Sequence, residues 1–61
     1  MYEITCNYGT CILENKEDAL KTLWLLGLYH GLKINAEKVK IELVKSGFYE
    51  AFPLIIREVD S

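Results

Sequence analysis

The sequence is poor in the residue types that most often carry chemistry. Its 61 residues include one histidine, two cysteines and one proline, and there are nine acidic residues against seven basic ones. It contains no Ser–His–Asp arrangement, no phosphate-binding glycine loop and no pair of carboxylates in a defined pocket. His30, the only imidazole, ends a helical segment, where a surface position near the helix C-terminus is its ordinary role. We therefore expect a non-enzymatic protein without a cofactor.

Two classes of partner are disfavoured by further absences. The formal net charge is −2, whereas nucleic-acid binders usually carry a basic surface that neutralises phosphates. The longest apolar stretch, Leu23–Tyr29, has seven residues, far fewer than the roughly 20 that span a bilayer. The N-terminal Met1-Tyr2-Glu3 lacks the basic and apolar pattern of a secretory signal. We expect a soluble, cytoplasmic protein.

Large apolar side chains, in contrast, are abundant. Hydrophobic residues make up 51% of the chain and charged residues 26%, a composition that excludes intrinsic disorder. Leu, Ile, Val, Phe, Trp, Met and Tyr together account for 26 residues. A chain of about 60 residues buries only roughly 60% of the surface that it exposes when unfolded. Some of these side chains must therefore lie on the surface or in an interface of the single domain that we expect over residues 1–61.

Residues 2–14 alternate between polar and apolar types, which predicts a β-hairpin. With a two-residue loop at Tyr8-Gly9, Cys6 faces Cys11 across the two strands. The apolar side chains then share one face, as a hairpin with one buried side requires. They are Tyr2, Ile4, Cys6, Cys11 and Leu13. A four-residue loop would keep the same pairing.

The two cysteines leave several interpretations open. In this register Cys6 and Cys11 lie at a non-hydrogen-bonded site, where opposing α-carbons are close enough for a disulfide. The alternative favoured by a cytoplasmic location is two reduced thiols that pack as small apolar side chains. A zinc site would need further ligands, for example from a second subunit. The spacing also differs from Cys-X-X-Cys, which argues against a redox enzyme.

Residues 16–30 have the signals of a helix, with Asn15 as N-cap, acidic residues in the first turn and Gly31 just past the C-terminus. The stripe predicted to face the sheet consists of Leu20, Leu23, Trp24, Gly27 and Leu28. The opposite side is apolar as well and carries Leu25, Leu26 and Tyr29. A helix that is apolar on every side needs cover on every side.

Residues 36–46 fit two structures. The capping Asn35 and the following Gly47 favour a helix. Its inner face would consist of Ala36, Val39, Leu43 and Val44. Strict alternation from Lys38 to Leu43 would also suit a strand. We favour the helix, because both of its ends carry the expected residue types.

The branched residues Leu54–Val59 follow Pro53 and are predicted to form a strand that joins the hairpin. The predicted fold class is therefore α+β. It is a small ββααβ domain in which the N-terminal hairpin and the C-terminal strand form one sheet, with two helices packed on one face.

The outer side of the first helix is the candidate contact surface for a dimer or a partner. Its predicted residues are Leu25, Leu26, Tyr29, Leu32 and Ile41. The second helix or the C-terminal strand could cover them within one chain, or identical helices of two copies could pair. We predict a protein–protein interaction module, a homodimer that regulates or inhibits a larger protein partner. Small accessory proteins of viruses and plasmids are of this kind, and such a protein would reside in the host cytoplasm.

The alternative function is a dimeric nucleic-acid-binding regulator. Lys38, Lys40 and Lys45 make the second helix locally basic, and a dimer could present two such helices together. Glu37 and Glu42 lie among these lysines, which is typical of an ordinary solvated helix. Nucleic-acid binding is therefore the second choice.

Overall fold

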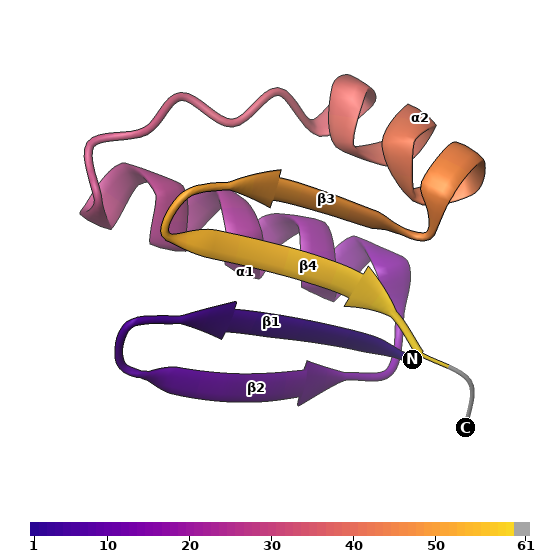
Figure 1. Ribbon diagram of the computed structural model, residues 1–61, viewed down its shortest axis with the longest axis horizontal. Coiled ribbons are helices and arrows are strands. Elements are labelled where there is room, and N and C mark those ends of the chain that lie inside the picture. Colours follow the sequence, from indigo (N-terminus) through magenta and orange to yellow (C-terminus); the bar gives the residue numbers. More distant parts are fainter. Residues whose placement is uncertain (60–61) are drawn as a thin grey trace.

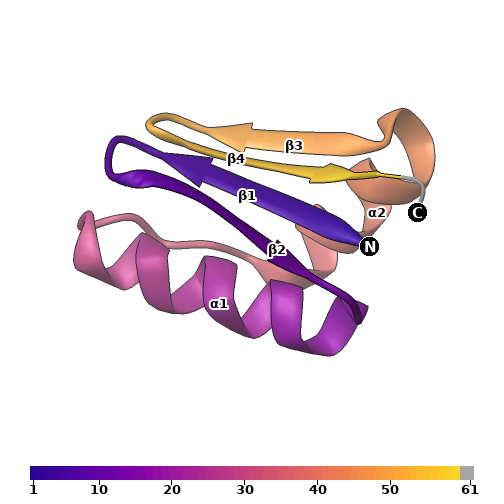
Figure 2. The ribbon, with the colours of Figure 1, turned by 90° about the horizontal axis from the view of Figure 1, so that it is seen from below.

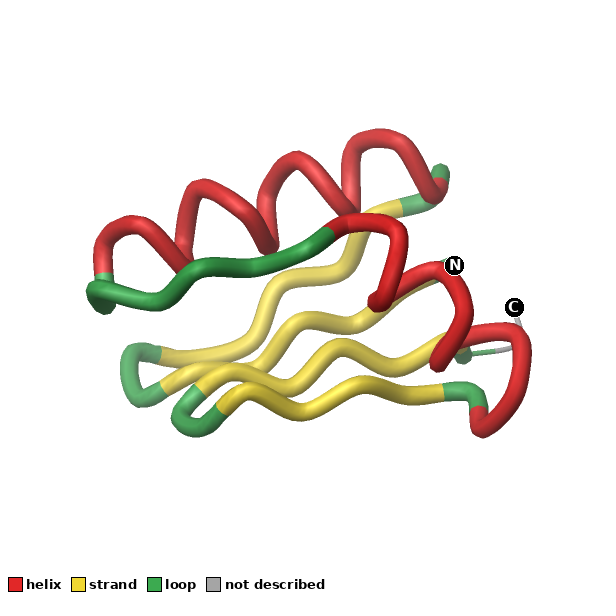
Figure 3. The backbone as a smooth tube through the Cα atoms, turned by 90° about the horizontal axis from the view of Figure 1, so that it is seen from above, coloured by secondary structure: helices red, strands yellow, loops and turns green. Residues whose placement is uncertain are grey.

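The computed structural model describes residues 1–59 and contains six elements. In chain order they are β1 (Tyr2–Cys6), β2 (Gly9–Leu13), α1 (Lys16–Tyr29), α2 (Ala36–Ser46), β3 (Phe48–Ala51) and β4 (Leu54–Glu58). The strands form one antiparallel sheet in the order β2-β1-β4-β3 (Figure 1). Both helices lie on the same face of this sheet (Figure 3). The predicted α+β fold class is thereby confirmed. Asp60 and Ser61, the end of the predicted domain, lie outside the described residues.

The C-terminal region forms a second hairpin where the sequence predicted a single strand. β3 pairs with β4 along its whole length, and Phe52 and Pro53, joined by a cis peptide bond, form the turn between them. The predicted strand is β4, which pairs with β1 and ends at Glu58 rather than Val59. The order of elements is therefore ββααββ.

The core lies between the sheet and the helices. Within residues 1–59, nine hydrophobic residues are buried in it, namely Tyr2, Ile4, Ala19, Leu20, Leu23, Val39, Leu43, Leu54 and Ile56. Ile4 and Ile56 are cross-strand partners at the centre of the sheet and are at most 1% exposed. Alternate residues of a strand point to the same face, so each central strand supplies two core side chains. Eleven large hydrophobic side chains remain exposed, which confirms that the interior is too small for all of them.

Both helices begin and end where the capping residues predict. Asn15 accepts a hydrogen bond from the Asp18 N–H (2.8 Å), and Asn35 accepts one from the Glu37 N–H (3.0 Å). Each cap satisfies an N–H group that has no partner within its helix. Gly47 ends α2 in the left-handed conformation, with φ of 80°. The strand alternative for residues 36–46 is wrong.

The register of the first hairpin differs from the prediction by two residues. Its loop is Asn7-Tyr8, so Cys6 pairs with Gly9 and Ile4 pairs with Cys11. A shift of two residues leaves every side chain on its original face. The predicted apolar face is therefore present, but the two cysteines do not face each other.

The inner faces of both helices are rotated from the predicted ones. On α1, Trp24 and Leu28 are exposed, and Ala19 is buried in their place beside Leu20, Leu23 and Gly27. On α2, Val39 and Leu43 are buried as predicted, whereas Ala36 and Val44 are exposed.

Gly27 lies where the loop between the helices packs against α1. A Cβ atom on Gly27 would lie only 2.5 Å from Cγ1 of Ile34, in this loop. The absent side chain therefore allows the loop to pass close against α1.

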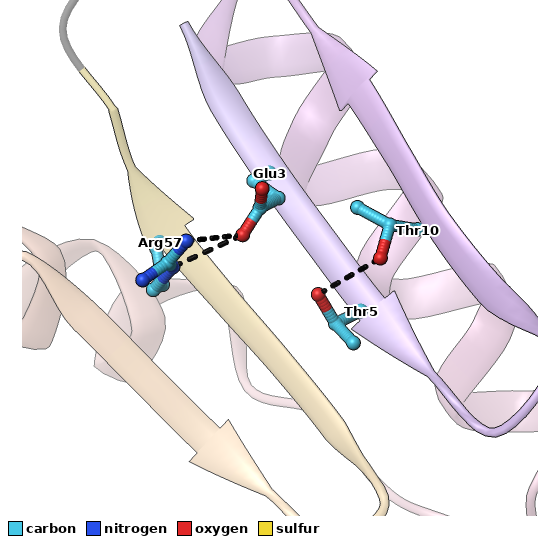
Figure 4. Close-up of polar contacts among 4 residues, drawn as sticks. All are labelled: Glu3, Thr5, Thr10 and Arg57. Carbon is cyan, nitrogen blue, oxygen red and sulfur yellow. Dashed lines mark hydrogen bonds and ion pairs between the residues drawn. The ribbon is translucent and has the colours of Figure 1, made fainter.

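The opposite face of the sheet carries a polar network. Arg57 on β4 donates to Oε1 of Glu3 on β1 through both Nε and Nη2, and the two side chains also form an ion pair (Figure 4). Beside them the hydroxyls of Thr5 and Thr10 lie 3.4 Å apart across β1 and β2. Ile12 and Phe48, the cross-strand partners of Glu3 and Arg57, lie on the same face and are exposed.

Candidate interaction surface

The C-terminal half of α1 carries an exposed group of large apolar side chains, which we call the α1 patch. Its residues are Trp24 (46% exposed), Leu25 (52%), Leu28 (53%) and Tyr29 (75%). Residues four apart on a helix lie one above the other. The α1 patch therefore consists of two parallel ridges, Trp24–Leu28 and Leu25–Tyr29, and it contains no charged residue.

An aromatic cluster extends this surface to the first hairpin. Tyr8, in the β1–β2 turn, meets Tyr29 edge to face at 6.4 Å between ring centroids and stacks on His30 at 6.0 Å. Tyr29 and His30 also meet edge to face, at 5.6 Å. Such pairs stabilise the contact beyond the area that they bury. The Tyr29 end of the Leu25–Tyr29 ridge thus lies next to the first hairpin.

A shallow cavity of about 300 Å³ lies between this hairpin and α1. Ile4, Cys6 and Cys11 line it from the strands, and Leu26 lines it from the helix. α1 lies to one side of the sheet in Figure 2, and it contacts β1 and β4 as well as β2. The walls of the cavity are mainly apolar, and Gly9, Thr10 and Cys11 of β2 are among the residues that line it.

The structure divides the predicted contact residues into two groups. Leu25 and Tyr29 are exposed neighbours on α1, and Ile41 is exposed on α2. Leu26 and Leu32 are partly buried against the core and cannot form a contact surface on their own. The neighbours that the prediction missed are Trp24, Leu28 and Tyr8. The exposure of Tyr8 could have been predicted from the sequence, because a large aromatic side chain in a tight turn projects into solvent.

Cys6 and Cys11 are both free thiols. They occupy diagonal positions on the same face of β1 and β2, and diagonal neighbours are separated by about 7–8 Å. A disulfide needs α-carbons closer than about 7 Å. The geometric argument for a bond between them therefore fails. Within residues 1–59, no three His, Cys, Asp or Glu side chains are grouped so that they could hold a metal ion.

The lysines of the nucleic-acid alternative do not converge on one surface. Lys40 pairs with Glu37 at 3.7 Å, in a partly solvated ion pair. Lys38 and Lys45 are seven residues apart and share one side of α2, whereas Lys40 is rotated by about 160° from that side, at 100° per residue. α2 therefore presents mixed charge to solvent.

Among residues 1–59, no helix has the length and apolar character needed to cross a bilayer. The chain matches no protein family, no curated protein and no solved structure.

Proposed function

We propose that this protein is a non-enzymatic interaction module that forms a homodimer through the Leu25–Tyr29 ridge of α1 and regulates a larger protein. The observation that carries the proposal is the α1 patch itself. Four large side chains lie side by side on a well-capped helix, and each is about half exposed or more. Isolated apolar residues are normal on a surface, but a contiguous group of this kind marks an interaction site.

A second copy of the chain is the occupant that best fits the Leu25–Tyr29 ridge. The ridge is uncharged, so two copies related by a two-fold axis meet without like-charge repulsion. Fully burying one large apolar side chain contributes roughly 1.5–3 kcal/mol. Covering part of Leu25 and Tyr29 on both copies therefore contributes on the order of several kcal/mol. The core holds only nine buried residues, and small domains commonly gain stability from such association.

The Trp24–Leu28 ridge lies on the other side of the α1 patch and remains available to a larger protein. Its two side chains are spaced as anchors for a helix that binds in an apolar groove. Tryptophan is also enriched among the residues that dominate binding energies. Regulation through this ridge is consistent with the same dimer.

The experiment compares three proteins by sedimentation equilibrium over a range of concentrations. The wild type is expected to show twice the chain mass. Leu25→Glu places two charges in the interface and should weaken dimerisation roughly 100-fold, which corresponds to about 3 kcal/mol. The matched control is Val44→Glu, which introduces the same charge at an 80% exposed position of α2 and should leave the dimer intact.

Two results would overturn the proposal. One is a wild type that stays monomeric at every concentration. The other is a dimer that Leu25→Glu and Val44→Glu weaken equally. Circular dichroism of both variants confirms that each has folded.

A further inference from the structure

β2 is an edge strand without the usual protection against pairing. It lies at one end of the sheet and pairs only with β1. Proteins commonly protect such edges with charged residues, proline or a covering element. Residues 4–13, which include all of β2, contain neither a charged residue nor a proline. The other edge strand, β3, contains Glu50 and is followed by Pro53.

The hydrogen-bond pattern shows which backbone groups of β1 point toward β2. The Val59 N–H donates to the carbonyl of Met1 at 2.9 Å, so Met1 directs its backbone groups toward the β4 side. Direction alternates along an antiparallel strand. The residues at even positions, Tyr2, Ile4 and Cys6, therefore bond with β2.

The same alternation identifies the free groups of β2. The partners of those residues are Leu13, Cys11 and Gly9, which consequently direct their N–H and C=O groups inward to β1. Thr10 and Ile12 direct theirs outward. The free edge of the sheet thus presents two N–H donors and two C=O acceptors from two residues.

We infer that β2 pairs in antiparallel register with β2 of a second copy, with Cys11 on the two-fold axis. In this register Thr10 of each copy exchanges both of its hydrogen bonds with Ile12 of the other. All four free groups of each β2 strand are then satisfied. A register centred on Thr10 or Ile12 would instead require partners in the loop or in the bend at Glu14. The dimer would contain one continuous eight-stranded sheet.

This inference rests on the proposed function and specifies the geometry of the dimer. Tyr29 contacts Tyr8 in the β1–β2 turn, and Leu26 lines a cavity together with Cys11. Tyr29, at the C-terminal end of the Leu25–Tyr29 ridge, therefore lies next to the β1–β2 turn, on the side of α1 that faces the first hairpin. Pairing at β2 brings this side of both α1 helices toward the two-fold axis. Strand pairing and the ridge then belong to a single interface.

The register makes a specific prediction for the cysteines. Cys11 and its copy form a non-hydrogen-bonded pair, in which α-carbons are about 4.5 Å apart. That separation lies within the range of disulfides, and Cys11 is exposed. Cys6 lies on β1, one strand further from the axis, and cannot reach its own copy.

The test uses two single-cysteine proteins, Cys6→Ser and Cys11→Ser, each treated with diamide. Diamide takes up two electrons and two protons as two thiols form one disulfide. Cys6→Ser, which keeps Cys11, is expected to become a covalent dimer at least tenfold faster than Cys11→Ser on a non-reducing gel. The reduced mass of both proteins is measured by sedimentation equilibrium in parallel.

The two measurements separate this inference from the proposed function. A dimeric mass with rapid crosslinking at Cys11 supports both. A dimeric mass in which Cys11 crosslinks no faster than Cys6 overturns β2 pairing and leaves the helix-mediated dimer standing. A monomeric mass overturns both.

A proline variant provides a second test that needs no cysteine chemistry. Ile12→Pro removes an outward N–H that β1 does not use, so the monomer should fold, since proline is tolerated at a strand edge. Glu50→Pro is the matched control, because the bond from the Glu58 N–H to the Gly47 carbonyl makes Glu50 point outward on β3. Dimerisation should weaken at least tenfold in Ile12→Pro only. Equal dimerisation of the two variants overturns the inference.

Discussion

The two flanks of the sheet are built from similar parts but end in different surfaces. Each flank has an edge strand of a hairpin, and each edge strand contacts a helix, β2 with α1 and β3 with α2. On the β3 flank, the edge strand contains Glu50, and α2 exposes charged and apolar side chains together, namely Glu37, Lys38, Lys45, Ile41 and Val44. On the β2 flank, the edge strand is uncharged and the outer side of α1 carries the α1 patch.

One small core is thus flanked by two edge strands of different composition, one with a charged residue and one without. Both flanks contribute buried side chains, Leu20 and Leu23 from α1 and Val39 and Leu43 from α2. What distinguishes the two edge strands is that β3 contains Glu50 and is followed by Pro53, whereas β2 has no charged residue and no proline. Charge and proline commonly hinder pairing at the edge of a sheet.

The largest changes in the free energy of unfolding are expected for substitutions on the inner, buried sides of the two helices. Leu23→Ala on α1 and Leu43→Ala on α2 remove side chains that are 1% and 2% exposed. Each should lower the free energy of unfolding by about 2–5 kcal/mol in urea titrations. Leu28→Ala and Val44→Ala, at exposed positions, should change it by less than about 0.5 kcal/mol. A large loss in Leu28→Ala would show that the outer side of α1 is buried within one chain.

Gly27→Ala, on α1, is expected to lower the free energy of unfolding by about 1–3 kcal/mol. Alanine favours helix formation by about 1 kcal/mol over glycine, but its methyl group would overlap Cγ1 of Ile34. Overpacking of this kind is usually the larger effect. When Ile34 is already replaced by Ala, the overlap is absent, and Gly27→Ala should then raise the free energy of unfolding. Urea titration of the four proteins of this cycle measures the coupling, and additive effects would contradict the packing explanation.

The caps of α1 and α2 should contribute about equally to the free energy of unfolding. Asn15→Ala and Asn35→Ala each remove a side chain that accepts hydrogen bonds from the first turn of its helix, and each should cost about 1 kcal/mol. Thermal unfolding followed by circular dichroism measures both. Substitution of either residue by Ser should restore most of the loss, whereas a Ser variant as unstable as the Ala variant would argue against capping.

The smallest effect is expected for DNA. α2 presents mixed charge, and the net charge of the chain is −2, so generic duplex DNA should not bind at micromolar protein in low salt. Fluorescence anisotropy of a labelled duplex measures this. Salt-dependent binding that Lys38→Glu and Lys45→Glu abolish would favour the nucleic-acid alternative instead.

The helices could be predicted from the sequence because their boundaries are set by local chemistry. Asn15, Asn35 and Gly47 act within one turn of the positions where they occur. The strand β3 was missed because only four residues separate Gly47 from the turn at Phe52. So short a segment has too little alternation to indicate a strand.

The candidate site could be predicted only in part. Leu25 and Tyr29 follow from the apolar character of the whole helix. Trp24 and Leu28 were placed on the wrong side, because a helix with apolar residues on every side gives no pattern that indicates which side faces the core. The hairpin register was wrong because a slip of two residues preserves the pattern of faces. The free edge at β2 is visible only in the structure.

Amide hydrogen exchange at the two edges of the sheet tests the central claim most directly. The N–H groups of Thr10 and Ile12 point out from β2, and those of Phe48 and Glu50 point out from β3. As the protein concentration rises, exchange at Thr10 and Ile12 should slow at least tenfold while exchange at Phe48 and Glu50 stays constant. Exchange that is independent of concentration at all four amides would contradict the account.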